Sequence, residues 1–205
     1  MIDKINFFDE ILKMNYVALE LGCGNVKKNI DSIGIDIINY DSVDLVGDAT
    51  NILKKIPDNS IDLIYSRHFL EHVVDFHVLM DEISRILKKD GILEFVVPHF
   101  SNPYYYSDIT HKNFFGLYSM NYFAHDMTKM KRLVPFYNKQ IKFNLVSVDL
   151  SYQTYSKNII FRAYKKIITS IFNYNTYTKE LYEGFFSFII SCYEIKFKLI
   201  KINKE

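Results

Sequence analysis

Four short apolar runs in the first half of the chain constrain its fold more than any other feature. They span residues 16–21, 32–38, 61–66 and 91–98, and each stops at a polar residue or a glycine. Because they show no regular alternation of polar and apolar residues, they are typical of strands buried on both faces of a parallel sheet. A weaker run at 43–49 predicts a further strand.

A helix is predicted between the third and the fourth run. Its apolar residues, from Val78 to Leu87, recur at helical spacing. Asp75 can cap its start, and Gly91 follows the lysines at its end, as expected of helix boundaries. Strand, helix and strand in this order form a βαβ unit, so the sequence predicts an α/β fold.

The other segments are interpreted from their own patterns. A leading helix is expected at 3–14, a strand at 141–152, and one or two helices at 157–190. Apolar residues that alternate with lysines at 193–202 are typical of an antiparallel edge strand. The stretch 99–125 is long, irregular and rich in Tyr, Phe, His and Asn, so we expect a functional loop or lid there.

The composition argues against several classes of function. With 25 Lys and Arg against 24 Asp and Glu, no global basic field favours nucleic acid. Two cysteines cannot build a disulfide framework, which favours a reducing cytoplasm. The N-terminal segment carries acids where a signal peptide carries bases, and it is too charged to span a membrane. We therefore expect a cytoplasmic protein without a membrane span.

A glycine-rich turn follows the first run. The sequence E-L-G-C-G begins at Glu20, and the next strand ends at Asp36, fourteen positions after Gly22. Glycines let the backbone turn sharply and approach a ligand, and α/β proteins bind ligands at the carboxyl ends of parallel strands. Asp36 can accept two hydrogen bonds from a ribose diol. We therefore expect a ribose-containing ligand at this turn.

Two kinds of cofactor compete for the turn. A dinucleotide site wants a third glycine for close helix packing, but Lys27 occupies that position. The acidic Glu20 would also repel a pyrophosphate. A cofactor with a cationic end fits better, and an NAD-binding or nucleotide-sugar enzyme is the weaker alternative.

The sequence E-L-G-C-G resembles motif I of the class I S-adenosylmethionine-dependent methyltransferases. Residues 47–73 are similar to the third and fourth motifs of that family, and residues 79–99 to the helix, glycine turn and strand that follow. The resemblance covers residues 16–99 in the correct order, and it points to the small methyltransferase-type-11-like subgroup associated with surface-polysaccharide genes. One departure is the interval before Asp36, which is too short for the usual helix.

The resemblance implies a Rossmann-like, doubly wound, mostly parallel sheet with an antiparallel C-terminal strand, and S-adenosylmethionine as cofactor. We expect one domain, 1–205, with a cofactor-binding core at 16–99, a substrate-covering lid at 100–135, and closing strands with inserted helices at 136–205. Each expected cofactor residue also has a structural alternative, such as a turn, a cap or, for a cysteine, small-residue packing. These residues are Glu20, Gly22, Cys23, Gly24, Asp36, Ile37, Asp48, Ala49, Ser66 and Arg67.

Catalytic residues are expected past the run at 91–98. His99 ends that run, where it would face the methyl group, and Asp108 and His111 lie in the loop that would cover it. A carboxylate can orient one imidazole while the other accepts the acceptor's proton. The same three could ligate a divalent metal, or Asp108 and His111 could only cap and buttress the loop. The expected substrate-binding residues are His72, Tyr104, Tyr106 and Lys112.

The main hypothesis is an S-adenosylmethionine-dependent O-methyltransferase of capsule or surface-polysaccharide biosynthesis. Its acceptor would be a small molecule, a carbohydrate such as a nucleotide sugar, or a phosphate-bearing compound of the phosphoramidate type. Arg67, Lys112 and Arg132 are the cations available to a phosphate. The alternative is a non-catalytic methyltransferase-like binding or scaffold subunit. A homodimer is a further expectation.

Overall fold

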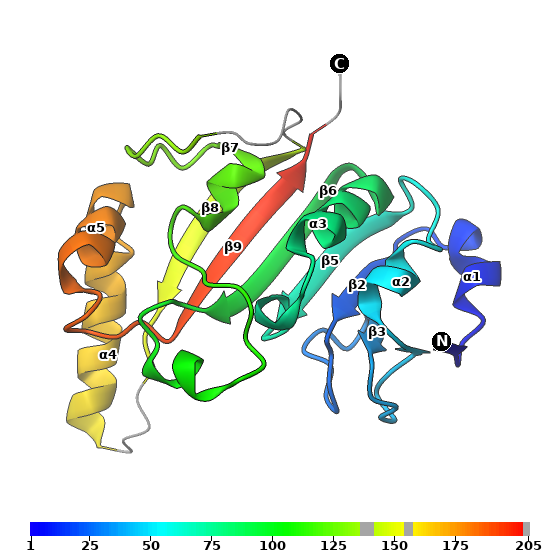
Figure 1. Ribbon diagram of the computed structural model, residues 1–205, viewed down its shortest axis with the longest axis horizontal. Helices are drawn as coiled ribbons and strands as arrows, with labels where there is room; N and C mark the ends of the chain where they lie inside the picture. Colours follow the sequence, from blue (N-terminus) through cyan, green and yellow to red (C-terminus); the bar gives the residue numbers. More distant parts are fainter. Residues whose placement is uncertain (136–141, 154–157, 203–205) are drawn as a thin grey trace.

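Nine strands form one sheet in the residues that the computed structural model describes, which are 1–135, 142–153 and 158–202 (Figure 1). The strand order is β1-β4-β3-β2-β5-β6-β9-β8-β7. The strands are β1 (Ile2–Asp3), β2 (Ala18–Leu21), β3 (Ile33–Asp36), β4 (Leu45–Val46), β5 (Ile61–Arg67), β6 (Leu87–Pro98), β7 (Ala124–Asp126), β8 (Phe143–Ser151) and β9 (Glu194–Lys201).

The centre of the sheet is parallel, and its C-terminal strand is antiparallel. β2 pairs in parallel with both β3 and β5, and β5 pairs in parallel with β6. β9 runs antiparallel to both β6 and β8. Leu19, Ile35, Ile64 and Leu93 are fully buried, because the apolar runs supply side chains to the core. This arrangement confirms the Rossmann-like, mostly parallel sheet.

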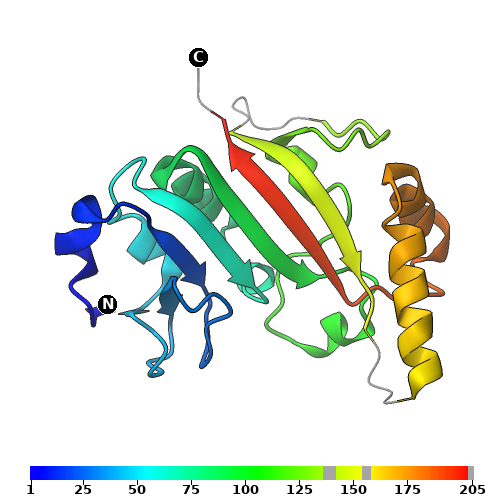
Figure 2. The same ribbon diagram turned by 180° about the vertical axis from the view of Figure 1, so that it is seen from behind.

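The helices cover one face of the central strands. In Figure 1, α2 and α3 lie in front of the strands, whereas Figure 2 shows β2, β5, β6 and β9 from behind with no helix across them. Between β2 and β3 the chain forms turns and bends, as the short interval before Asp36 predicted. The helices are α1 (Phe7–Glu10), α2 (Ala49–Leu53), α3 (Phe76–Ile86), α4 (Ile159–Phe172) and α5 (Thr176–Leu181).

The helix predicted after Asp75 forms but ends earlier than expected. Asp75 caps α3 through its carboxylate, as predicted, and the helix stops at Ile86. β6 begins at Leu87, so the helix end predicted at Gly91 is wrong. Leu87 is fully buried and pairs with Ile61 of β5, which requires the chain to be extended before the glycine.

The N-terminal segment is not a single helix over 3–14. Residues Ile2 and Asp3 form β1 at the edge of the sheet, where they pair with β4. The carboxylate of Asp3 then accepts two backbone N–H groups, and α1 begins only at Phe7. The pairing with β4 therefore holds the first residues extended and shortens the helix.

The C-terminal strand was predicted at the sheet edge but lies inside the sheet. β9 is hydrogen-bonded to β6 on one side and to β8 on the other. Its Lys196 and Lys198 both bind Glu94, at 3.1 and 3.0 Å, while Phe197 between them is fully buried on the other face. The alternation therefore distinguishes two faces of an interior strand.

The remaining predicted elements are confirmed. The strand expected at 141–152 is β8, and the helices expected at 157–190 are α4 and α5, followed by a π-helical turn at Tyr182–Phe186. Ile141 and Lys157, at the starts of these two predicted segments, lie outside the described residues.

One side of α4 exposes an apolar stripe. Ile160, Tyr164, Ile167 and Ile171 follow one another by four, three and four positions, and each is at least half exposed. The structure contains one chain, so the homodimer stays a prediction.

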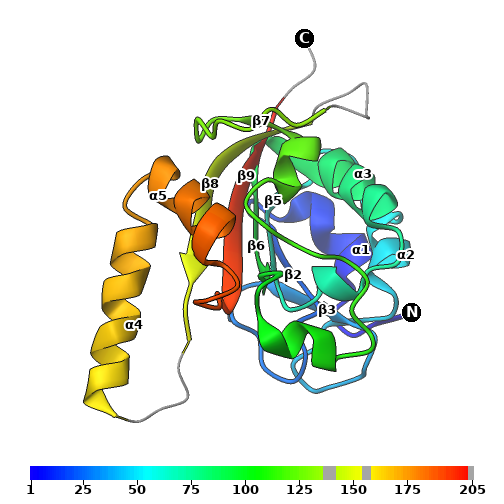
Figure 3. The same cartoon turned by 60° about the vertical axis from the view of Figure 1, so that its left-hand side comes forward.

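In the described part of the chain, no helix combines the length and the apolarity needed to cross a membrane. Figure 3 shows α4 and α5 beside the sheet, at the end where β8 lies.

Acid is expected to weaken the contact between β6 and β9 through Glu94. Partial burial alone would raise the pKa of Glu94, but hydrogen bonds from Lys198 and Lys196 lower it below its ordinary value. The stabilisation is therefore complete above the pKa of the unfolded chain and is lost as the pH falls through the lowered folded value. Urea unfolding between neutral pH and about pH 3 should show a smaller loss of stability in Glu94→Gln than in the wild type.

The control for this experiment is Glu10→Gln, which removes an exposed ion pair with Lys13. Exposed pairs contribute little to stability, so this variant should follow the wild type across the same pH range. Parallel losses in the wild type and Glu94→Gln would contradict the prediction.

Candidate active site

The glycine turn at the carboxyl end of β2 has a backbone conformation that glycine adopts most easily. Gly22 and Gly24 have φ angles of +66° and +61°. The N–H groups of Gly22 and Cys23 bind the carbonyl of Ile35 and tie the turn to β3. A Cβ on Gly22 would lie 2.5 Å from the Cβ of Phe69, whereas one on Gly24 would meet no atom of the described residues within 4 Å. The turn is closed by Phe69 and open at Gly24.

Glu20 organises the segment that stands in place of the usual helix. Its side chain is buried, and its carboxylate accepts the N–H groups of Lys28 and Asn29 at 2.9 Å. The hydroxyl of Ser32 donates to the same carboxylate at 3.3 Å. Protein groups therefore surround this charge, and its contact with the cofactor stays a prediction.

Asp36 ends β3 and faces the glycine turn. Its carboxylate accepts the N–H of Gly24 and the N–H of Ile38, both at 2.9 Å. The neighbouring Ile37 is 72% exposed, which is unusual for a large apolar side chain beside a strand end. A carboxylate with an exposed apolar neighbour suits a nucleoside, since one can bind the ribose and the other can cover the base.

Two further predicted residues begin α2. The carboxylate of Asp48 accepts the N–H of Asn51 at 2.9 Å and caps the helix, and Ala49 is buried in the first turn. Asp48 itself is exposed beside β4. β4 pairs in parallel with β3, and Asp36 lies opposite Val46. Asp48 follows Val46 by two residues, so it lies at the same edge of the sheet as Asp36.

Cys23 and Ser66 lie buried near the turn. Burial, with the nearby carboxylates of Asp36 and Glu20, raises the pKa of the Cys23 thiol to about 12, so it stays protonated at neutral pH. This fits a packing residue and not a nucleophile. The hydroxyl of Ser66 is buried without a hydrogen-bond partner in the described part of the chain. Such an orphaned group is one that a bound ligand can satisfy.

An ion-pair network occupies the end of β5. Arg67 and His68 bind the same oxygen of Glu194, at 2.7 and 2.6 Å, and His68 also lies 3.2 Å from Glu71. Burial alone would lower the pKa of His68, but hydrogen bonds to Glu194 and Glu71 raise it to about 9, so the imidazole is cationic at neutral pH. Arg67, predicted to bind the cofactor, is therefore engaged with Glu194 in this structure.

The loop after β6 returns to the end of β5 and brings three metal-binding side-chain types together. The N–H groups of Lys112 and Asn113 bind the carbonyl of Glu71 at 2.6 and 3.1 Å. As a result, ligand atoms of Glu71, His72 and His111 all lie within 4.8 Å of one another. We refer to these three side chains as the Glu71 cluster.

The convergence of His99 with His111 stays a prediction, since the contacts found for His99 in the described residues are with other groups. Its imidazole is fully buried and contacts the Ser101 hydroxyl at 2.8 Å and the Glu183 carboxylate at 3.3 Å. Tyr182 packs against this ring from the C-terminal part of the chain, and His99 also pairs with Phe115 of the loop in an isolated bridge. Asp108 does stay near His111, with 3.7 Å between its carboxylate and Nε2.

Three residues of the site were not among the predicted ones. Phe69 closes the glycine turn, Glu71 belongs to the cluster, and Thr110 binds His72 at 2.8 Å. Glu71 could have been found from the sequence, because it directly precedes His72, which was predicted to bind the substrate. The contacts of Phe69 and Thr110 arise only when distant loops meet, so the sequence carries no local signal for them.

Residues 19–95 match the model of a family described as the methyltransferase domain. A search of curated protein sequences gave no match. Among solved structures, an S-adenosylmethionine-dependent methyltransferase from Archaeoglobus fulgidus is 17% identical, with 96% of this chain and 91% of that chain covered and a TM-score of 0.56. Residues 19–95 therefore resemble a methyltransferase domain, and the fold is that of an S-adenosylmethionine-dependent methyltransferase. The non-catalytic alternative gains no support.

Two other solved structures share this fold. One is a Haloferax volcanii complex of a methyltransferase with its activator Trm112, at 14% identity, 96% and 88% coverage, and a TM-score of 0.54. The other is phosphoethanolamine N-methyltransferase 2 of Haemonchus contortus with S-adenosyl-L-methionine, at 17% identity and a TM-score of 0.53. The match to the latter covers 97% of this chain and 53% of that one.

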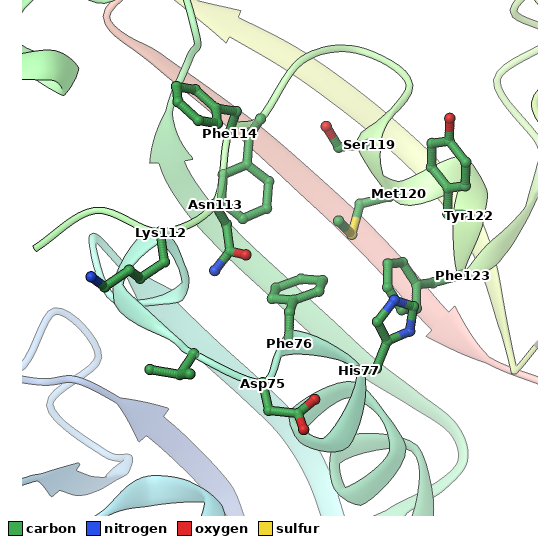
Figure 4. A pocket seen from close by; sticks show the side chains of 12 residues that line it. Asp75, Phe76, His77, Lys112, Asn113, Phe114, Ser119, Met120, Tyr122 and Phe123 are labelled. Carbon is green, nitrogen blue, oxygen red and sulfur yellow. The ribbon is translucent and has the colours of Figure 1, made fainter.

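A cavity of about 720 Å³ lies between the loop that follows β6 and the start of α3 (Figure 4). Lys112 is on its rim, and Phe76, Met120 and Phe123 give it an apolar wall. Lys112, the first residue of the loop that lines this cavity, directly follows His111 in the sequence. Tyr104 and Tyr106, also predicted to bind substrate, are more than half exposed outside its lining; they lie at Pro103–Ser107.

Proposed function

We propose that the enzyme transfers the methyl group of S-adenosylmethionine to an oxygen of a small-molecule, carbohydrate or phosphoramidate-type acceptor in capsule or surface-polysaccharide biosynthesis. The observation that carries the cofactor assignment is the glycine turn, which is open at Gly24 and faces Asp36. The ribose would bind Asp36, the base would lie on Ile37, and the orphaned hydroxyl of Ser66 would contact the cofactor.

Methyl transfer from a sulfonium is an in-line displacement, so positioning and exclusion of water supply most of the rate. An acceptor hydroxyl must also lose its proton. We assign this step to the site around His111, whose side chain is 10% exposed at the return of the loop and has the Asp108 carboxylate 3.7 Å from Nε2. His99, enclosed by Tyr182 and Glu183, supports the end of β6.

The acceptor is proposed to enter through the cavity beside the loop. Lys112 on its rim offers a cation to a phosphate, whereas Arg67 is paired with Glu194 and Arg132 lies over the ring of Tyr118. Screening nucleotide sugars and phosphorylated small molecules for release of S-adenosylhomocysteine would identify the acceptor. We place the enzyme in the cytoplasm, in keeping with its two free, buried cysteines.

Calorimetry with S-adenosylhomocysteine tests the cofactor site. We expect binding to the wild type, and Asp36→Asn should weaken it by about tenfold or more, because a hydrogen bond to a charged group contributes roughly 1.5–3 kcal/mol. Asp9→Asn, at an exposed carboxylate of α1, should bind like the wild type. No binding to folded wild type at high micromolar ligand would refute the proposal, and binding of NAD in its place would favour the dinucleotide alternative.

A further inference from the structure

The Glu71 cluster has the composition of a transition-metal site. Two imidazoles and one carboxylate are a ligand set that Zn²⁺ and other divalent first-row metals take in proteins. One potential ligand atom from each side chain lies within 4.8 Å of the others. Atoms that share an ion at about 2.0–2.2 Å lie roughly 3–4 Å apart, so small side-chain rotations complete the set.

The hydrogen bonds of His72 fix which ring nitrogen is free. Its Nδ1 lies 2.8 Å from the hydroxyl oxygen of Thr110, and that hydroxyl donates its only proton to Asp108 at 2.5 Å. Thr110 can therefore only accept from His72. The neutral imidazole carries its proton on Nδ1, which leaves the lone pair of Nε2 for a metal.

His111 has the same orientation for a different reason. Its Nδ1 lies 2.9 Å from the backbone carbonyl of Tyr105, which can only accept a hydrogen bond. The Nε2 lone pair is again available. A ring N–H that donates to a protein oxygen is the arrangement that orients histidine ligands in metal sites.

Glu71 supplies an independent observation. Its side chain is 1% exposed, and one of its oxygens lies 3.2 Å from His68. The other oxygen, Oε2, is buried and has no hydrogen-bond partner in the described residues. A buried carboxylate oxygen without a partner is costly, and a cation held with His72 and His111 would compensate it.

We propose that Glu71, His72 and His111 bind one divalent transition-metal ion. Three protein ligands leave at least one coordination position open; His72 is partly exposed, and the His111 side chain is 10% exposed. A hydroxyl or phosphate oxygen of the acceptor is the class of ligand that fits it. This use of the open position rests on the proposed function, whereas binding of the ion does not.

Calorimetric titration of the chelator-treated full-length chain with Zn²⁺ is the test. We expect one site per chain. Glu71→Gln keeps the shape of the side chain and should weaken binding roughly tenfold or more, and the double variant His72→Ala/His111→Ala should abolish it. His125→Ala, at an exposed histidine of β7, should bind Zn²⁺ like the wild type.

Thr110→Val separates a metal site from a structural cluster. It leaves all three ligands in place but removes the group that orients His72, so Zn²⁺ affinity should fall roughly 10–100-fold. A merely structural Thr110 would leave Zn²⁺ affinity unchanged. Circular dichroism of each variant establishes that it is folded, and the Co²⁺ spectrum should lack the thiolate band that binding by Cys23 or Cys192 would give.

Two outcomes would overturn the site: a folded wild type that binds neither Zn²⁺ nor Co²⁺, or a double variant that binds Zn²⁺ as tightly as the wild type. S-adenosylhomocysteine titrated in the presence of chelator keeps this failure distinct from that of the proposed function. Cofactor binding without Zn²⁺ binding would reject only the metal site. Zn²⁺ binding without cofactor binding would reject only the methyltransferase site.

Discussion

Deletion of residues 191–205 is expected to leave a chain that does not fold. The deletion removes β9, which lies between β6 and β8 and pairs with both. Its Ile195, Phe197 and Leu199 are fully buried. Burying three such side chains contributes roughly 5–9 kcal/mol, which is comparable to the whole stability of a domain, about 5–15 kcal/mol. Circular dichroism and thermal unfolding should show no cooperative transition.

Point variants in β9 allow the same prediction to be tested without a truncation. Phe197→Ala should destabilise the protein by about 3–5 kcal/mol, since it opens a cavity in the core. Lys196→Ala, at the next residue but on the half-exposed face, should cost no more than about 1 kcal/mol. A monomeric truncated chain that unfolds cooperatively and binds S-adenosylhomocysteine would refute the prediction.

The parallel core could be predicted because strands buried on both faces must be apolar along their whole length. Ala18, Leu19, Glu20 and Leu21 of β2 are all buried, and even the charged one has its hydrogen bonds supplied by the chain. Local pattern and tertiary burial agree in β2, whereas β5 and β6 alternate between buried and partly exposed residues, because no helix covers their second face (Figure 2).

Element boundaries were less predictable because they depend on distant partners. α3 ends where Leu87 pairs with Ile61, not where Gly91 would permit a helix to end. In β9, alternation with lysines suggested an edge, but Glu94 on the adjacent strand accepts both lysines and makes an interior position favourable. Neither partner can be identified from the local sequence.

In the site too, contacts between residues close in sequence were predictable, and contacts between distant residues were not. The glycine turn and Asp36 are close in sequence, and the structure joins them through a hydrogen bond from Gly24. His111, by contrast, meets His72 across 39 positions, because backbone hydrogen bonds attach the loop to Glu71. The pairing of His111 with His99 was expected from their positions near one strand, and it stays a prediction, since the contacts found for His99 in the described residues are with other groups.

Replacing each glycine of the turn by alanine is expected to affect a different property: mainly stability at Gly22, and mainly cofactor affinity at Gly24. At Gly22, a left-handed residue costs about 1–2 kcal/mol, and the added Cβ would lie 2.5 Å from the Cβ of Phe69, which cannot move without its backbone. Overpacking of this kind costs roughly a further 1–3 kcal/mol. Gly22→Ala should therefore lower the free energy of unfolding by about 2–5 kcal/mol in urea titrations.

Gly24→Ala has nearly the same φ, +61°, but its Cβ would meet no atom of the described residues within 4 Å. Only the conformational cost of about 1–2 kcal/mol should appear in its stability. If the open space beside Gly24 is where S-adenosylmethionine binds, the methyl group intrudes on the cofactor. The affinity for S-adenosylhomocysteine should then fall by about tenfold or more, equivalent to roughly 1.4 kcal/mol, although the variant is the more stable of the two. Equal losses of stability in both variants, or unchanged cofactor affinity in Gly24→Ala, would show that the turn is only structural.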